Sequence, residues 1–225
     1  LLLAVVALVM PAVFELVTYG KWDTGTAPLP VQHLSLLVCI VLILIYGASL
    51  IFSLKTHHAL IAPGHGDVHQ PRLRRGVALG LLLASTVITA FMAEFLVSSI
   101  HAATTALGMS EFFVGVIVVA VIGNAAEHFS AVVMARKDKM DLAVTICTAS
   151  STQIALFVAP VLVFASYLFG NPMSLVFNAF EVVAIALSVF ILSVVSLDGE
   201  SNWFEGLQLV GVYLVLGIVF FFVGH

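Results

Sequence analysis

Long apolar runs divide the chain into segments, each near the roughly 20 residues that cross a bilayer as a helix. Clusters of Pro, Gly and charged residues separate the runs, as in TYGKWDTGTAPLP, APGHGDVHQP and ARKDKMD. The third run is longer than a perpendicular crossing needs, so we expect a tilted helix there. The pattern predicts seven transmembrane helices, at about residues 1–18, 31–54, 76–104, 112–135, 142–168, 173–197 and 203–224.

The composition supports an all-α polytopic membrane protein. The chain is 62% hydrophobic and only 9% charged, with a mean hydropathy of +1.20, so it lacks the polar surface of a soluble domain. Its eight Lys and Arg residues are too few and too scattered for a nucleic-acid partner. Cys39 and Cys147 both lie inside apolar runs, and their positions suggest neither a disulfide framework nor a zinc site.

The basic residues predict the orientation. If the loops alternate sides, the 55–75 and 136–141 loops share one side, which holds all the Lys and Arg residues except Lys21. The positive-inside rule makes that side cytoplasmic and places the C-terminus outside. The first residues, LLLAVVALVMP, contain no initiator Met and no charged segment, so they are no signal peptide. We expect the chain to begin inside a longer protein.

The 55–75 loop is also rich in histidine. Histidines so close together can bind a transition metal, or the loop can be a solvated linker that binds nothing specific. Both interpretations stay open for the set His57, His58, His65 and His69.

The predicted spans contain the carboxylates of Glu15, Glu94, Glu127 and Glu181. An ionisable group at mid-membrane costs about 2.5–3.5 kcal/mol on insertion scales and usually marks a functional site. Glu15 lies near the end of its span and can reach the interface. Glu127 lies near the centre of its run, in the stretch IGNAAEHFS. Asn124, Glu127 and His128 are spaced i, i+3, i+4 and therefore share one helical face.

The following helix carries a second polar group. A short basic turn joins the two helices, so they should be antiparallel neighbours whose polar faces meet at similar depth. Together they offer a carboxylate, amide oxygens and hydroxyls, which suit a hard cation such as Ca²⁺ or Na⁺. The alternative is a buried hydrogen-bond network that holds helices together. The polar residues of the second helix are Ser150, Ser151, Thr152 and Gln153.

Several other polar residues have two possible roles. Glu94 begins a stripe with Ser98 and His101, and Glu181 pairs with Asn178 at i, i+3. Both glutamates, like Ser151 and Thr152, can support the cation ligands or carry protons, or they can be structural. His128 lacks the further nitrogen or sulfur ligands that zinc prefers. A proton-handling role suits its imidazole better.

The stretch GNAAEHFSAVVMARKDKMDLAVTICTASSTQIALFVAP resembles the second of two repeat motifs in the calcium/cation antiporter superfamily, most closely its cation/proton exchanger branch. Further matches are AEFLV (93–97), FNAFEVVA (177–184) and DGESNWFEG (198–206). The resemblance implies eleven helices with two five-helix repeats of inverted topology. Residues 1–54 would then be the last two helices of an incomplete first repeat, 55–75 a cytoplasmic linker, and 76–225 the complete second repeat.

The resemblance also implies roles for individual residues. Glu127 would be the cation-binding carboxylate, His128 the proton-coupling residue, and the neutral oxygen partners would be Asn124, Ser150 and Gln153. Ala149 stands where the family pattern has Gly. The glutamate motif of the first repeat is absent, and one carboxylate cannot neutralise Ca²⁺ or fill its six to eight oxygen positions. We therefore expect a missing N-terminal repeat as the partner that completes the site.

By this resemblance the chain belongs to a bacterial inner-membrane antiporter that exchanges Ca²⁺, and/or Na⁺ or K⁺, for protons without a cofactor. Two alternatives remain. One is an intramembrane metal-dependent hydrolase built on His101 and His128, although we see no nucleophile, base and orienting group arranged for covalent chemistry. The other is a membrane subunit that transports nothing. The sequence does not rank the cations or give an oligomeric state.

Overall fold

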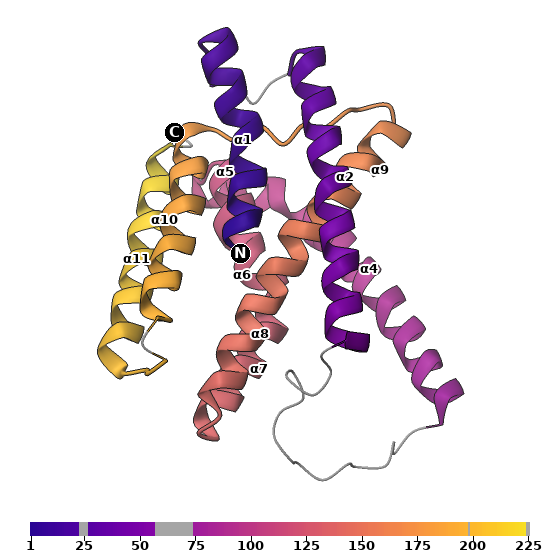
Figure 1. Cartoon of the computed structure of the whole chain (residues 1–225), viewed down its shortest axis with the longest axis vertical. Coiled ribbons are helices and arrows are strands. Elements are labelled where there is room, and N and C mark those ends of the chain that lie inside the picture. The colour runs from indigo at the N-terminus through magenta and orange to yellow at the C-terminus, as the bar shows by residue number, and fades with distance from the viewer. Residues whose placement is uncertain (23–26, 57–73, 198, 224–225) are drawn as a thin grey trace. The chain divides into compact units, whose positions relative to one another are not determined.

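The computed structural model describes residues 1–22, 27–56, 74–197 and 199–223, and these contain helices and no β-strand. The histidine-rich segment with His57, His58, His65 and His69 lies outside the described residues. Figure 1 shows the helices α1 (Leu2–Tyr19), α2 (Leu29–Ile51), α4 (Arg75–Leu107), α5 (Glu111–Phe113), α6 (Ala120–Gly123), α7 (Ala125–Arg136), α8 (Met140–Gln153), α9 (Ala159–Leu168), α10 (Ala179–Val195) and α11 (Trp203–Val223). Three π-helical stretches extend them: η1 (Phe52–Thr56), η2 (Val114–Val119) and η3 (Ile154–Val158).

The prediction of an all-helical integral membrane protein is confirmed. Within the described residues, five helical runs are long and apolar enough to cross a membrane: α1, α2, α4, the α8–η3–α9 run and α11. The helical stretches Glu111–Gly123 and Ala125–Arg136 pass the same test together and are bent by 51° at their junction, as in a broken span or a re-entrant loop. Helix α10 is apolar but has 17 residues, slightly fewer than the roughly 20 that span a bilayer. The count of seven spans therefore stays a prediction.

The sixth predicted span begins later than the sequence indicated. Residues 171–178, which we call the strap, form no regular secondary structure, and α10 starts at Ala179 instead of 173. Pro172 cannot donate to a helix, and Asn178 ends the strap with a capping box. The Glu181 N–H donates to Asn178 Oδ1 at 2.9 Å, and the Asn178 N–H donates to Glu181 Oε2 at 2.8 Å. These reciprocal bonds fix the start of α10.

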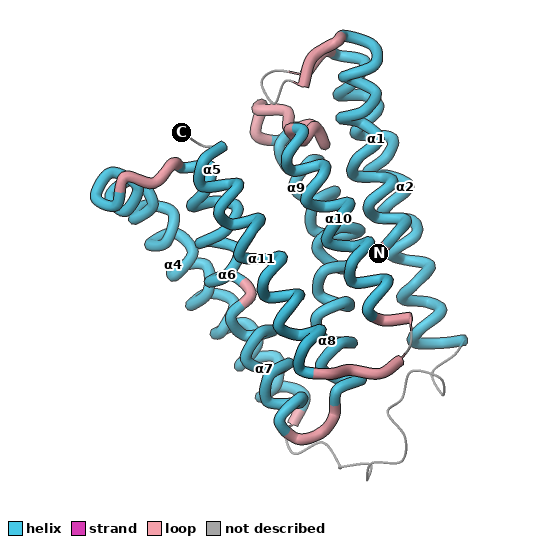
Figure 2. The backbone as a smooth tube through the Cα atoms, turned by 90° about the vertical axis from the view of Figure 1, so that its left-hand side faces the viewer, coloured by secondary structure: helices cyan, strands magenta, loops and turns pink. Residues whose placement is uncertain are grey.

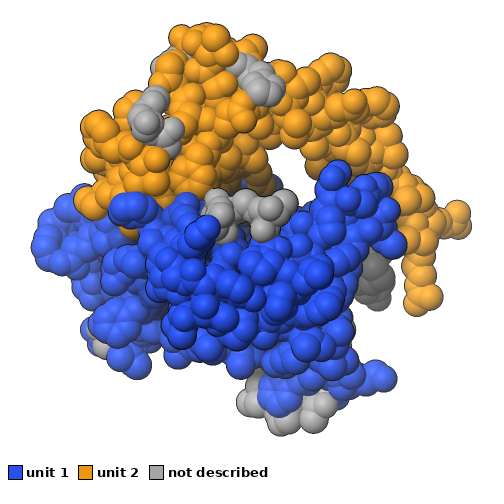
Figure 3. Space-filling model, turned by 90° about the horizontal axis from the view of Figure 1, so that it is seen from above, with its two compact units in different colours: residues 1–58, 124–212 blue, residues 59–123, 213–225 orange. Residues whose placement is uncertain are grey.

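The chain forms two compact units, which Figure 3 colours separately. Unit 1 comprises Leu1–His58 and Asn124–Val212, and unit 2 comprises Ala59–Gly123 and Tyr213–His225. Aromatic pairs pack within unit 2, where Phe112 and Phe220 have ring centroids 5.7 Å apart. The buried core of unit 1 consists of Ala4, Leu8, Cys39, Leu42, Leu156, Val163 and Leu175. The division of the chain into two repeats stays a prediction.

Helices α7 and α8 form an antiparallel hairpin, as the short basic turn predicted. The turn between them is visible as a loop in Figure 2. Asp138 adopts a positive φ of 59°, which an aspartate tolerates better than most residues. The Lys139 N–H donates to the Met134 carbonyl at 3.0 Å and closes the turn. The hairpin places the start of α7 beside the second half of α8.

Candidate functional site

The candidate site is built around the point where the helical run from Glu111 is interrupted. Asn124 leaves the helical conformation, with φ −100° and ψ 15°, and α7 begins at the next residue. Glu127 consequently lies in the first turn of α7. A helix N-terminus carries unsatisfied N–H groups and a partial positive charge, which favour a nearby negative charge. The break therefore gives Glu127 an electrostatic environment that the middle of an unbroken apolar helix would lack.

Glu127 lines a cavity of about 570 Å³ within unit 1. One wall is polar and comes from α7 and α8, and the other is apolar and comes from α1, η3, α9, the strap and α10. The polar wall consists of Asn124, Glu127, His128, Cys147, Ser150 and Ser151. The apolar wall consists of Leu8, Ile154, Ala155, Ala159, Phe177 and Ile185. The structure thus brings together five of the polar residues that the sequence singled out.

The α8 hydroxyls are arranged with their oxygens available to a ligand. The hydroxyls of Ser150 and Ser151 both donate to the Cys147 carbonyl, at 3.2 and 2.9 Å. Because each hydroxyl donates its hydrogen to a backbone carbonyl of the helix, the lone pairs of its oxygen can face a cation in the cavity. Glu127 and Ser150 are half-buried, and His128 is exposed. The polar wall can therefore offer carboxylate, amide and hydroxyl oxygens, the ligands of hard cations.

Gln153 and Thr152 lie elsewhere. They line a separate cavity of about 470 Å³ within unit 1, together with Tyr46, Ser49 and Ala149 among others. The Thr152 hydroxyl donates to the Thr148 carbonyl at 2.7 Å. Ala149, which stands where the family pattern has Gly, also faces this second cavity. The sequence argument paired Ser150 with Gln153 at i, i+3, but the structure assigns the two to different cavities.

Cys147 is the polar-wall residue that the sequence argument missed. Positions 147, 150, 151 and 154 all line the Glu127 cavity. They are spaced i, i+3, i+4 and i+7, the pattern of a single helical face. That spacing could have been recognised in the sequence, but Cys147 was interpreted only as an apolar residue. Its thiol is exposed.

The remaining intramembrane carboxylates have other surroundings. Glu181 is engaged in the capping box of α10, so it has a structural role whether or not it also carries protons. Glu94 is exposed on α4 in unit 2, and nothing is described of the His101 side chain. Glu15, which we expected to reach the interface, is instead only 3% exposed. It faces the interior because its neighbours Pro11 and Ala12 lie on the same buried side of α1.

The family profile described as "Sodium/calcium exchanger protein" matches residues 77–222. The chain is 45% identical to a "Ca(2+)/H(+) antiporter" of Aphanothece halophytica, covering 98% of this chain and 62% of that protein. It is 42% identical to the "Ca(2+)/H(+) antiporter ChaA" of Bacillus subtilis, covering 96% of this chain and 61% of that protein. The chain thus spans about three fifths of the length of these relatives.

The fold is similar to that of a solved relative. The crystal structure of the selenium-substituted Ca²⁺/H⁺ antiporter protein YfkE superposes with a TM-score of 0.76 at 39% sequence identity. The match covers 98% of this chain and 61% of YfkE.

The two cavities predict that Glu127 acts electrostatically on Cys147 and not on residue 153. We expect a cationic methanethiosulfonate to modify native Cys147 faster than an anionic one, and Glu127→Gln to lower that rate ratio several-fold. The matched control is Gln153→Cys in a Cys147→Ser background, where the ratio should change little because residue 153 lines the other cavity. Equal changes at both positions would show that Glu127 does not distinguish the two faces of α8.

Proposed function

The chain belongs to the sodium/calcium exchanger protein family, and on this premise we propose that it is part of a cation/proton antiporter that exchanges Ca²⁺ for H⁺ across a membrane. The observation that carries the proposal is the cavity in which Glu127, Asn124 and Ser150 meet. The names of the relatives, which are Ca²⁺/H⁺ antiporters, favour Ca²⁺ over Na⁺ and K⁺. Neither the hydrolase alternative nor the non-transporting subunit receives support from these relatives.

The cavity supplies part of a calcium site. Ca²⁺ binds about six to eight oxygens and is best held by more than one carboxylate. In this cavity Glu127 provides one carboxylate, and Asn124, Ser150 and Ser151 provide neutral oxygens. We propose that a second glutamate motif, on a segment outside this chain, completes the coordination. Gln153 would join the cation only after a change that turns its side chain out of the second cavity.

Exchange follows from competition for one group. When Glu127 is protonated, it loses the charge that holds the cation, and when the cation binds, the proton must leave. Alternating exposure of this one site to the two sides of the membrane then couples the opposite fluxes. His128 follows Glu127 and lines the same cavity. We propose that its imidazole relays protons to and from the carboxylate, while Glu94, Glu181 and Thr152 are candidates for a longer proton path.

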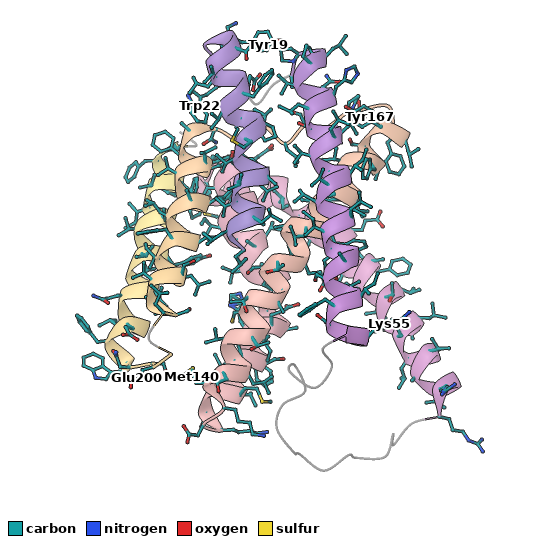
Figure 4. The ribbon with its side chains drawn as sticks, in the orientation of Figure 1. Tyr19, Trp22, Lys55, Met140, Tyr167 and Glu200 are labelled. Carbon is teal, nitrogen blue, oxygen red and sulfur yellow. The ribbon has the colours of Figure 1, made fainter. Side chains whose placement is uncertain are left out.

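We further propose an orientation in a bacterial inner membrane, with the α7–α8 turn in the cytoplasm and the C-terminus outside. Lys55 and Met140, beside the basic turn, lie at one end of unit 1, while Tyr19, Trp22 and Tyr167 lie at the other (Figure 4). Basic residues favour the cytoplasmic end, and Tyr and Trp favour membrane interfaces.

The orientation predicts that the cysteine of a Lys139→Cys variant is modified by a membrane-impermeant thiol reagent only from the cytoplasmic side. A cysteine added after His225 should react only from the outside. Modification of both from the same side would disprove the orientation.

The central test of the function is Glu127→Gln in the full-length protein. Glutamine keeps the shape and one oxygen but removes the charge and the proton site, so Ca²⁺-dependent proton flux in everted vesicles should fall to background. Thr145→Ala, on α8 but outside the Glu127 cavity, serves as a control and should retain flux. Normal exchange by Glu127→Gln would refute the assignment of the site.

The role of His128 is tested by the pH profile of exchange. If its imidazole relays protons, His128→Asn should shift the pH optimum and weaken coupling more than it weakens cation binding, because Asn keeps an oxygen and an N–H but cannot titrate. Exchange rates across a pH series, together with Ca²⁺ binding to the purified protein, separate the two effects. A large loss of affinity with an unchanged pH profile would show that His128 serves the cation instead.

A further inference from the structure

The apolar wall of the Glu127 cavity is continuous with the core of unit 1. Leu8 belongs both to the wall and to the buried core cluster, and Phe177 and Ala155 line the cavity and pack against the same cluster. Phe177 comes from the strap, the stretch without regular secondary structure between α9 and α10. The cavity therefore meets close-packed hydrocarbon on one side and polar groups on the other.

The strap is fixed by side-chain acceptors at intervals along its backbone. The Met173 N–H donates to Ser166 Oγ at 2.8 Å, and the Leu175 N–H donates to Ser35 Oγ at 3.1 Å. Irregular backbone at membrane depth persists only where such groups are satisfied within the protein. The Ser35 contact joins residues 140 positions apart, and both partners are buried, with Ser35 0% and Leu175 2% exposed.

The anchor at Leu175 determines where Phe177 lies. Leu175 enters the core cluster and Phe177, two residues later, packs against that cluster at the edge of the cavity. The capping box at Asn178 fixes the strap immediately after Phe177. The phenyl ring is thus held between two anchored points.

The strap lies at the opposite end of unit 1 from the α7–α8 turn, as Figure 1 shows. Phe177 of the strap lines the Glu127 cavity together with polar residues of α7 and α8, the two helices that lead to the turn. An apolar constriction can stop water and ions by dewetting. An exchanger needs such a closure, since a cavity open to both sides at once would leak the cation.

We propose that Phe177 closes the Glu127 cavity on the side of the α9–α10 connection, and that Ser35 is a positioning residue that holds this closure through the strap. The inference rests on the proposed function for its purpose, but the barrier itself is a property of the cavity. Ser35 is not among the residues that line the Glu127 cavity. It acts only through Leu175 and the ring two residues beyond.

The reporter for the test is Cys147, whose thiol lines the cavity on the polar wall, whereas the other cysteine, Cys39, is buried. The full-length protein in sealed vesicles of known orientation is treated with an impermeant cationic methanethiosulfonate from one side at a time. Phe177→Ala should raise the rate at Cys147 from the α9–α10 side several-fold and leave the rate from the α7–α8 side unchanged. Phe177→Leu should keep the low rate, because a large apolar side chain remains.

The positioning role of Ser35 is tested by a separate pair of variants. Ser35→Ala should raise the same rate, by less than Phe177→Ala, and Ser35→Thr should restore it because the hydroxyl acceptor returns. Ser166→Ala removes the hydroxyl that anchors the strap at the exposed Met173, four residues before Phe177, and should have little effect. If Phe177→Ala does not fold, Phe177→Val provides a milder opening with an increase in the same direction.

Two results would overturn the proposal. An unchanged rate from the α9–α10 side in Phe177→Ala or Phe177→Val would show that the ring is no barrier. Equal increases in Ser35→Ala and Ser166→Ala would show general loosening of the strap instead of a specific anchor. Labelling requires no transport, so a native protein without Ca²⁺/H⁺ exchange would refute the proposed function while the labelling still decides the closure.

Discussion

A carboxylate in the middle of an apolar span must be solvated by the protein, because the surrounding lipid offers it nothing. Glu127 imposes this requirement on the structure around it. The helix is interrupted at Asn124, so that the carboxylate lies in the first turn of α7. Helix α8 packs antiparallel beside it and presents Ser150 and Ser151 to the same cavity. The polar wall of the cavity thus supplies the polar surroundings that the Glu127 carboxylate requires.

The same constraint applies to backbone groups. The strap leaves the helical conformation, and N–H groups outside a helix need other acceptors where water is excluded. Serine hydroxyls and the Glu181 carboxylate accept from its N–H groups. The π-helical stretch η3 ends shortly before Pro160, whose missing N–H deprives the preceding turn of a donor. The strap and η3, two segments outside the regular α-helices, thus both contribute residues to the cavity.

Much of this arrangement was predictable from the sequence. Hydropathy predicted the all-helical class and most of the helix boundaries, because a run of about 20 apolar residues is typical of a helix that crosses a membrane. The i, i+3, i+4 spacing correctly placed Asn124, Glu127 and His128 in one cavity with Ser150. Gln153 lines the other cavity, because a spacing of three residues fits two adjacent faces of a helix. The cavity face is instead the 147, 150, 151 and 154 stripe.

Two features could not be predicted from the sequence, namely the strap and the burial of Glu15. The strap has the apolar composition of a helix, and its anchor at Ser35 depends on a contact between residues 140 positions apart. No local pattern encodes such a contact. Glu15 looked able to reach the interface by its place in the span, but its exposure is decided by packing against other helices. Both depend on tertiary structure.

The central claim is that a proton and a cation compete for the Glu127 carboxylate. The most direct measurement is the number of protons released when Ca²⁺ binds to the purified full-length protein, obtained by calorimetry in buffers of different ionisation enthalpy across a pH series. The account predicts proton release that grows as the pH falls and a loss of the Glu127 share of that release in Glu127→Gln. Ca²⁺ binding that releases no protons at any pH, or release that is unchanged by Glu127→Gln, would contradict it.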